Sequence, residues 1–537
     1  MGQQCTNIHD NKEEKLDEHS ISMTLEKNFL LIPIWNGAKM IRINLSIDGQ
    51  NVREFDAELA TTREQISFWS FLDITAFQKK EAILKLDGAT EEGIALITQA
   101  DEILDASGFY NEPLRPQFHF SQMLGWNNDP NGMVYYDGEW HLYFQHNPYG
   151  WKWGNMHWGH ATSTDLVHWK QLPIAIYNKQ HGDWAFSGSA VVDENNTAGW
   201  QTGNEKVIVA SWTSTGRGEC VAYSNDRGRT FTEYEGNPVV QHAGRDPKII
   251  WYQPGKHWVM AVYDESEESG RSIAFYTSGD MKNWEFHSKL EGYYECPEIF
   301  ELPVDGDSNN TRWVLFAADA RYAIGQFDGK VFSPEHDEKY QVHYGKYYAS
   351  QIFNNSPDGR KIQIGWAQIE MPNMPFNQTF SFPHSLTLRT TDIGIRMFAE
   401  PVKEIEILHR KQHISKNVSL VENQPVNLNV SGELFDIRAK FQINDAKIIG
   451  LDVGGEKITY DTKENQLNGI EMTPINGEIS IQILVDRPML EIVGNNGRVF
   501  LTNPRQQHGE VSLISAFVKE GQARLVSLEA NELRSIW

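Results

Sequence analysis

Short runs in which apolar and polar residues alternate dominate the sequence and predict a protein built mainly from β-strands. In the segment KMIRINLSIDG (39–49), isoleucine or leucine stands at every second position, the period of a strand with one buried face. The segment ends in Asp48-Gly49, and two apolar runs near the C-terminus flank Asn496-Gly497. Both dipeptides favour hairpin turns, so we expect antiparallel pairing of neighbouring strands.

Between residues 113 and 400, five apolar strand candidates each begin with a polar residue: WNNDPNGMVYY, FSGSAVV, RDPKIIW, ECPEIFEL and ASQIF. Their polar markers lie about 50 to 60 residues apart and are Asp129, Ser187, Asp246, Glu295 and Ser350. Repeats of this length are typical of four-stranded propeller blades. A second repeat, Ser-x-Asp shortly before an aromatic residue, occurs in STDLVHW, SNDRGRTF and SGDMKNW. The pattern predicts a five-bladed β-propeller whose five polar strand starts converge at one end of the central channel.

The flanking segments predict a tail, two further domains and a linker. Residues 1–22 are polar and expected to be disordered, and residues 23–106 are expected to form a small N-terminal β-domain. In FAEPVKEIEILHRKQH, Val402, Ile405 and Leu408 share a face, which predicts a linker helix over 401–413. Residues 414–537 are expected to form a C-terminal β-sandwich. The expected fold class is therefore all-β: a propeller over 113–400 followed by a sandwich, with a small N-terminal β-domain.

Charge and composition narrow the possible partners. The chain of 537 residues carries a formal charge of −24, which would repel nucleic acid and anionic lipid, so we expect no nucleic-acid partner. No apolar run approaches the length of a membrane helix, so no membrane span is expected. Aromatic residues make up 12% of the sequence, with 17 tryptophans, a content that suits stacking on sugars as well as core packing. A neutral ligand is therefore favoured.

Cysteine and histidine residues predict neither a disulfide framework nor a metal site. The three cysteines cannot all pair within the chain, and their spacing fits no metal motif. His146, His157 and His160 also match no dedicated site, so we expect no metal and no cofactor. The start MGQQCT matches a myristoylation pattern, but we favour a chain start after a removed signal, with Cys5 a remnant of a lipid-anchor region.

Three of the five strand starts bear carboxylates: Asp129, Asp246 and Glu295. Each alone can be a turn or loop residue, and Asp-Pro-Asn-Gly at Asp129 predicts a tight turn. Together around one channel they would repel one another, a cost expected only where they have a chemical task. Two carboxylates suffice for cleavage of a glycosidic bond, one as nucleophile and one as acid.

The neighbours of these carboxylates suggest their roles. Asn128 and Asn131 could hold Asp129 as an anion, as a nucleophile requires. Glu295 lies among aromatic residues in YYECPEIF, where partial burial would favour the protonated acid, and Cys296 is interpreted as a small apolar neighbour that adds to this desolvation. Arg245 is expected to hold Asp246 ionised for binding sugar hydroxyls.

These residues resemble glycoside hydrolase family 32, the invertase, inulinase and levanase family. WNNDPNG is close to the family's Trp-Met-Asn-Asp-Pro-Asn-Gly box, with Asn127 in place of Met. YFQHNP, WGNMHWGHATSTDLVHW, FSGSAVV, RDP, ECP and Gly365-Trp366 follow in the family's order, and LVDRPMLEIVGNNG resembles its sandwich domain. The resemblance is strong over about residues 113–400.

The resemblance implies a propeller and sandwich that release fructose from β-fructofuranosides with retention of configuration. It makes Asp129 the nucleophile, Glu295 the general acid/base and Asp246 the transition-state stabiliser. The family's fructose pocket corresponds to the residues Asn128, Gln145, Trp153, Phe186, Ser187, Arg245 and Trp366. For Trp153 and Trp366 the alternative role is packing in the core. For Gln145 the alternative role is a hydrogen bond to the backbone.

The expected substrates are levan, inulin, fructo-oligosaccharides and sucrose, with exo action favoured. An endo-levanase, a fructosyltransferase on the same scaffold and a non-catalytic fructan-binding protein are the alternatives. Linkage preference and oligomeric state are not readable from the sequence. Because fructans are large and extracellular, a periplasmic or extracellular location, with a lipid anchor as one form of it, is expected if a signal was removed.

Overall fold

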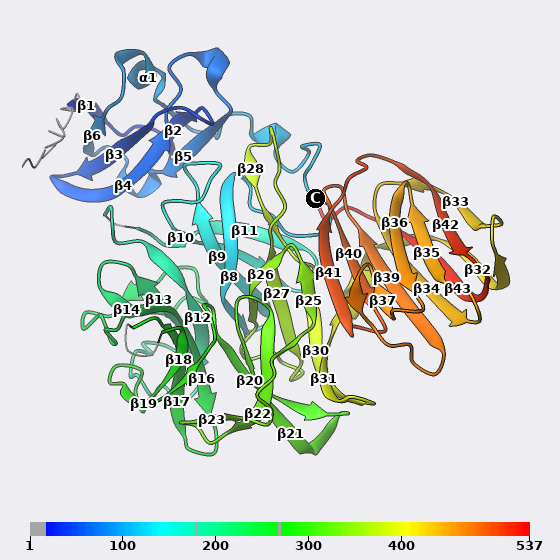
Figure 1. Cartoon of the computed structure of the whole chain (residues 1–537). Helices are drawn as coiled ribbons and strands as arrows, with labels where there is room; N and C mark the ends of the chain where they lie inside the picture. The colour runs from blue at the N-terminus through cyan, green and yellow to red at the C-terminus, as the bar shows by residue number, and fades with distance from the viewer. Residues whose placement is uncertain (1–17, 179, 267–269) are drawn as a thin grey trace, which may run out of the picture. The chain divides into compact units, whose positions relative to one another are not determined.

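The computed structural model describes residues 18–178, 180–266 and 270–537, and β-strands dominate it (Figure 1). The chain divides into two compact units, one of residues 1–106 with 179–181 and one of residues 107–178 with 182–537. Most of the predicted tail and its Cys5 motif lie outside the described residues. The tail prediction to residue 22 is nevertheless wrong at its end, because strand β1 begins at Glu18.

The first unit consists of two antiparallel sheets. One has the order β1-β6-β3-β4 and contains β1 (Glu18–Thr24), β6 (Glu81–Asp87), β3 (Met40–Ile47) and β4 (Gln50–Glu58). The other has the order β5-β2-β7 and contains β5 (Phe68–Asp73), β2 (Phe29–Ile34) and β7 (Thr98–Ala100), and the helix α1 (Glu91–Leu96) precedes β7. Ile41, Ile43, Leu45 and Ile47 are buried, and β3 pairs with β4 across Asp48-Gly49, which confirms the predicted hairpin.

The second unit begins with three sheets, each formed by one continuous stretch of chain. The exception is β28, which comes from later in the chain and joins the first sheet. The first, in the order β11-β10-β9-β8-β28, contains β8 (Gly125–Tyr136), β9 (Glu139–Asn147), β10 (His157–Ser163), β11 (Trp169–Ile176) and β28 (Phe376–Asn377). The second contains β12 (Ala185–Asp193), β13 (Val207–Ser214), β14 (Gly218–Ser224) and β15 (Thr232–Glu233). The third contains β16 (Gly244–Tyr252), β17 (His257–Asp264), β18 (Ser272–Ser278) and β19 (Glu285–Glu291).

The next sheet joins two stretches of chain through β30. Its first part contains β20 (Glu298–Val304), β21 (Asp307–Phe316), β22 (Arg321–Phe327), β23 (Phe332–Pro334) and β24 (Tyr340–Gln341). Its second part contains β26 (Tyr347–Ile352), β27 (Lys361–Ala367), β29 (Thr379–Phe380), β30 (His384–Thr391) and β31 (Gly394–Pro401). The first strands of successive stretches are neighbours in space: β8 contacts β12 and β26, β12 contacts β16, and β16 contacts β20 (Figure 1).

Neighbouring sheets pack face to face through shared cores. Strand β17 shows why its sequence HWVMAVYD is almost continuously apolar. Trp258, Met260 and Val262 enter the core shared with the β12–β15 sheet, whereas Val259 and Ala261 enter the core shared with the β20–β23 sheet. Alternate side chains point to opposite faces, so a strand covered on both sides needs apolar residues at every position.

The C-terminal part consists of two packed sheets. One contains β25 (His343–Gly345), β41 (Val499–Pro504), β40 (Met489–Gly494), β39 (Glu478–Val485), β34 (Phe435–Ile443), β43 (Gln522–Leu533) and β32 (His409–Val421). The other contains β33 (Val426–Gly432), β42 (Val511–Lys519), β35 (Ile448–Val453), β36 (Glu456–Asp461), β37 (Gln466–Leu467) and β38 (Ile470–Glu471). Their inner faces share one apolar core. The predicted hairpin at Asn496-Gly497 is confirmed between β40 and β41.

The predicted linker helix over 401–413 is wrong in type and extent. A short 3₁₀ helix occupies Lys403–Leu408, and the chain is extended from His409. Val402, Ile405 and Leu408 are buried, and their spacing of three residues matches the three residues per turn of a 3₁₀ helix. In the described residues, no helix has the length and apolar character needed to cross a membrane.

A buried charge cluster ties the segment before β8 to the C-terminal sheets. His119 Nδ1 lies 2.8 Å from Asp486 Oδ2, and its Nε2 lies 3.1 Å from Glu491 Oε2. Asp486 also accepts hydrogen bonds from the backbone N–H groups of Gln117, Phe118 and His119. Burial alone would lower the pKa of His119, but the charges of Glu491 and Asp486 raise it to about 9.

We expect His119→Gln to lower the free energy of unfolding by about 3–5 kcal/mol, because it leaves two buried carboxylates without their cation. Since the folded pKa of His119 is raised from 6.5 to about 9, its stabilising contribution is complete below about pH 6.5 and is lost as pH rises through about 9. Urea unfolding at several pH values measures both effects. The control is His413→Gln, whose partner Glu532 is partly exposed, and a similar loss there would contradict a special role for the cluster.

Candidate active site

The strands that carry the predicted site residues each have a register shift near their start, and these shifts direct the side chains toward one site. The pairing register shifts between Asn127 and Pro130 in β8 and between Ala185 and Gly188 in β12. It shifts again between Arg245 and Lys248 in β16, and between Tyr348 and Gln351 in β26. A β-bulge bends a strand and redirects a side chain, so these shifts turn Asp129, Ser187 and Asp246 out of the regular ladder. The predicted tight turn at Asp129 is therefore wrong: the residue lies within the bulged strand β8.

Backbone strain marks the same region. Asp246, Glu295 and Cys296 have φ angles of +67°, +42° and +41°. This left-handed region is unfavourable for residues other than glycine and is retained where the surrounding structure fixes it, often at functional sites. This conformation sets the direction in which the side chains of Asp246 and Glu295 leave the backbone.

The structure brings the three carboxylates together around Cys296. The Cys296 sulfur lies 3.7 Å from Asp129 Oδ2 and 3.4 Å from Asp246 Oδ2, and its backbone N–H donates to Asp246 Oδ2 at 3.0 Å. Glu295 is the preceding residue. The expectation that Cys296 mainly desolvates Glu295 therefore needs correction, because its thiol contacts the other two carboxylates.

Asp129 accepts side-chain hydrogen bonds from two residues besides the Cys296 thiol. Ser187 Oγ donates to Oδ2 at 2.7 Å, and Asn128 Nδ2 donates to Oδ1 at 3.0 Å. Asn131, the other amide expected to support it, is fully buried and makes no side-chain hydrogen bond within the described chain. Burial raises the pKa of Asp129, and the two hydrogen bonds only partly oppose this rise.

Asp246 has a strongly perturbed pKa. Burial, together with the charges of Asp129 and Glu295, raises its pKa to about 8. The predicted contact with Arg245 is not formed. Arg245 donates instead to Glu295 Oε1, from Nη2 at 2.5 Å and from Nε at 3.1 Å. Asp246 lies in the bulge of β16 and has a left-handed φ, so its direction relative to Arg245 does not follow the regular alternation of a strand.

Glu295 is held at two points and stays partly accessible, with 19% of its side chain exposed. Tyr348, from the start of β26, donates its hydroxyl to Oε2 at 2.8 Å. The other end of Arg245 reaches Glu265 at 2.9 Å. Tyr348 was not among the predicted site residues, although it precedes the fifth strand marker, Ser350, by two positions.

The remaining predicted pocket residues form the wall around these carboxylates. Trp126 donates to Asn128 at 3.0 Å and meets Trp366 edge to face at 5.9 Å. Trp366 in turn meets Tyr348 at 6.2 Å and donates to Gln378 at 3.0 Å. These contacts connect Trp366 to Glu295 through Tyr348, and to Asp129 through Trp126 and Asn128.

On the opposite wall, Trp153 is 49% exposed and contacts Phe186 at 6.0 Å and Trp184 at 5.1 Å, so it is no core residue. Trp184 was not predicted, and its position two residues before Phe186 is the only sequence signal for it. Gln145 is buried and donates to the carbonyl of Ala185 at 3.0 Å, the structural role considered as its alternative. A cavity of about 420 Å³ opens beside Phe186 and Arg245.

The three histidines considered for a metal are each engaged elsewhere. His146 Nδ1 lies 2.8 Å from the carbonyl of Trp126, His157 contacts the carbonyl of Asn155, and His160 lies 3.1 Å from His141. Over residues 18–178, 180–266 and 270–537, no group of three or more His, Cys, Asp or Glu side chains is arranged to hold a metal ion.

Such a site can supply a nucleophilic carboxylate, a hydrogen-bonded acid and a third carboxylate that holds hydroxyl groups. If Asp129 must be ionised to react, its raised pKa places the acidic limb of kcat/KM above the ordinary value of 3.8. Ser187→Ala removes a hydrogen bond to the charged form and should move this limb to higher pH by about one unit. Rates measured from pH 3 to 8 test this. Ser189→Ala, on the same strand but bonded to the backbone of Pro247, should leave the limb in place, and equal shifts would refute the assignment.

Two family models match the second unit: "Glycosyl hydrolases family 32 N-terminal domain" over residues 119–401 and "Glycosyl hydrolases family 32 C terminal" over residues 404–532. A levanase of Bacillus subtilis (strain 168) is 36% identical over 496 residues, covering 80% of this chain and 72% of the relative. Invertase 1 of Saccharomyces cerevisiae is 35% identical over 384 residues, covering 63% and 71%.

Solved structures agree with these matches. The exo-inulinase of Aspergillus awamori superimposes with a TM-score of 0.72 at 26% identity, and the match covers 80% of this chain and 100% of that one. The β-fructofuranosidase of Schwanniomyces occidentalis, complexed with fructosyl-erythritol, gives a TM-score of 0.71 at 28% identity, covering 80% and 100%.

Proposed function

The chain belongs to glycosyl hydrolase family 32, and we propose that it removes terminal fructose from β-fructofuranosides with retention of configuration. Convergence of Asp129, Asp246 and Glu295 around Cys296 is the observation that carries this proposal. Fructans and sucrose are the proposed substrates. Relatives named levanase, exo-inulinase and invertase support this substrate class, and the exo-inulinase supports exo action.

In the proposed reaction, Asp129 attacks the anomeric carbon and forms a fructosyl ester. Glu295 gives its proton to the leaving glycosidic oxygen and then takes a proton from the water that cleaves the ester. Arg245 and Tyr348 keep the Glu295 carboxyl group aimed at that oxygen. Asp246 binds fructose hydroxyls in this proposal and so stabilises the oxocarbenium-like transition state. With its pKa raised to about 8, it does this near neutral pH mainly in the protonated form, which can donate a hydrogen bond to a hydroxyl group.

The residues that surround the three carboxylates would determine which sugar unit of the substrate binds there. Asn128, Gln145, Ser187 and Trp366 surround the fructosyl unit in this proposal, and Trp153 and Phe186 contact it at the rim. The cavity beside Phe186 and Arg245 could take the rest of the substrate, because Arg245, which lines it, binds Glu295, where the leaving group departs.

We further propose that the sheets of residues 113–400 form a five-bladed propeller. Support comes from the neighbouring first strands β8, β12, β16, β20 and β26 and from a repeated turn. In STDLVHW, SNDRGRTF and SGDMKNW, a serine bonds the aspartate two positions on, and that aspartate accepts nearby backbone N–H groups. This turn precedes the fourth strand of each of the first three sheets. The domain boundaries predicted from sequence, with the linker placed at Lys403–Leu408, complete the proposal.

Purified enzyme should release free fructose from levan, inulin or sucrose, and chromatography of the products tests this directly. Oligosaccharides from levan would instead indicate endo action, and transfer products at high sucrose would indicate a fructosyltransferase. NMR of the first product formed should show retained configuration. Absence of any hydrolysis of the three substrates would overturn the proposal. Relatives named extracellular exo-inulinase support an extracytoplasmic location.

A further inference from the structure

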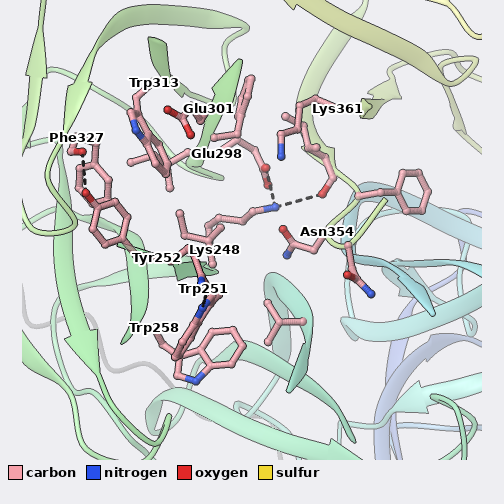
Figure 2. A pocket seen from close by; sticks show the side chains of 18 of the residues that line it. Lys248, Trp251, Tyr252, Trp258, Glu298, Glu301, Trp313, Phe327, Asn354 and Lys361 are labelled. Atoms are coloured by element: carbon pink, nitrogen blue, oxygen red, sulfur yellow. Dashed lines mark hydrogen bonds and ion pairs between the residues drawn. The ribbon is translucent and has the colours of Figure 1, made fainter. Parts of the chain in front are cut away.

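A second cavity lies at the opposite ends of the strands that carry the active site. Its volume is about 630 Å³, within the range of ligand sites, and we call it the distal pocket (Figure 2). The residues that define it are Lys248, Trp251, Tyr252, Glu298, Trp313 and Lys361.

The distal pocket is separate from the catalytic carboxylates. Asp246 stands near the start of β16, and Trp251 and Tyr252 stand at its end. At about 3.3 Å per residue, five and six residues of extended chain place Trp251 and Tyr252 about 17 and 20 Å from Asp246, whereas Lys248 in the floor is two residues from it. A ligand that contacts these two rings therefore lies outside the active site.

Aromatic side chains form one part of its wall. Trp251, Tyr252 and Trp313 are each partly exposed. Trp313 lies 6.0 Å from Tyr252 and 5.2 Å from Phe327, and Trp251 lies 5.0 Å from Trp258, so each ring is held by a neighbour (Figure 2). Fixed aromatic faces of this kind bind the apolar faces of flat ligands at low entropic cost.

Charged side chains of both signs form the floor. Lys248 donates to the carbonyl of Ile352 at 3.2 Å and pairs with Glu298 at 2.7 Å, and both side chains are almost completely buried. Burial raises the pKa of Glu298 to about 7 despite this pair. Lys361 points into the cavity and forms no side-chain hydrogen bond or ion pair with the part of the chain that the structure describes.

This lining selects for hydroxyl groups. A hydroxyl group can accept a hydrogen bond from the Lys361 ammonium and donate one to the Glu301 carboxylate. Since Lys248 and Glu298 are buried against each other, an anionic ligand would meet the exposed Glu301 and a cation would meet Lys361. Aromatic faces together with mixed polar partners therefore favour a neutral ligand with several hydroxyls.

We propose that the distal pocket binds a neutral saccharide segment and is a second, non-catalytic carbohydrate site. The choice of fructan as that saccharide rests on the proposed function. On a polymer, such a site would hold the chain near the enzyme without taking part in bond cleavage, so it should matter for fructans and not for sucrose.

Calorimetric titration with a short fructo-oligosaccharide tests this in an Asp129→Asn background, where the ligand is not consumed. Two binding events are expected. Adding Trp313→Ala or Lys361→Met should weaken one of them at least about tenfold and leave the other unchanged. Lys361→Met keeps the side-chain length, so it also serves if Trp313→Ala fails to fold. Phe286→Ala, an exposed aromatic residue outside the pocket, is the matched control.

A single binding event, or two events that neither pocket substitution weakens, would overturn the proposal. In otherwise wild-type enzyme, both substitutions should leave kcat on sucrose within about twofold and lower the rate on dilute polymer. Loss of sucrose hydrolysis in the wild type would count against the proposed function alone, whereas unchanged binding in the pocket variants with normal sucrose hydrolysis counts against the distal site alone.

Discussion

Asp129→Asn is expected to lower kcat on sucrose and fructans by about 10⁴-fold or more, the scale seen when a covalent nucleophile is lost. The amide has the same size and can still accept the hydrogen bond from Ser187, so the pocket should stay intact. It cannot form the fructosyl ester, and no other carboxylate can replace it, because the Asp246 side chain is bound to the backbone and thiol of Cys296. Steady-state rates with each substrate measure the loss.

A matched control lies in the same sheet. Asp165 is also a partly exposed aspartate, but it accepts hydrogen bonds from the backbone of Val167 and His168 in a turn. Asp165→Asn should keep kcat within a few fold. If Asp129→Asn retained comparable activity, or if a trapped fructosyl group were found on another residue by mass spectrometry, Asp129 would not be the nucleophile.

The approximate position of the site could be predicted because strand spacing and residue type are local properties. Asp129 and Asp246 are separated by about two repeats and Asp246 and Glu295 by about one, and equal repeats place equivalent residues at the same end of a ring. The hairpins at Asp48-Gly49 and Asn496-Gly497 could be predicted for the same reason, because a turn dipeptide between apolar runs involves only neighbouring residues.

Partners within the site could not be predicted, because they depend on where bulges redirect side chains. Arg245 is next to Asp246 in sequence, yet it binds Glu295, 50 residues away. Tyr348 reaches Glu295 from a strand that follows it by a similar distance in sequence. Positive φ angles at Asp246 and Glu295 could not be predicted from residue type, because aspartate adopts this region more often than most residues but still in a small minority of positions, and glutamate adopts it rarely.

Electrostatic behaviour was the least predictable property. Asn128 supports Asp129 as expected, but burial outweighs it and the pKa of Asp129 is raised. Asp246, expected to be ionised by Arg245, has its pKa raised to about 8 by burial and by Asp129 and Glu295. Burial and mutual repulsion arise only once the strands have assembled, so no local pattern contains them.

Glu295→Gln is expected to lower kcat on sucrose by about 10²- to 10⁴-fold, the contribution of a general acid/base. The amide oxygen of glutamine can still accept the hydrogen bonds from Arg245, and its N–H group can donate to the Tyr348 hydroxyl oxygen, so the substitution keeps both contacts and removes the transferable proton. The loss should be much smaller for a fructoside whose leaving group departs without protonation. Its measurement is the ratio of kcat values for the two substrates in wild type and variant.

External nucleophiles separate this role from a merely structural one. With Asp129 intact, the variant should form the fructosyl ester from an activated substrate, and the ester should then accumulate because no general base activates water. Azide needs no base, so it should accelerate turnover and yield a fructosyl azide of retained configuration. Glu265→Gln is the control, because Glu265 binds the same Arg245 from the exposed side at 2.9 Å and should show neither effect. Equal losses on both substrates, without azide rescue, would mean that Glu295 positions Arg245 and does not transfer the proton.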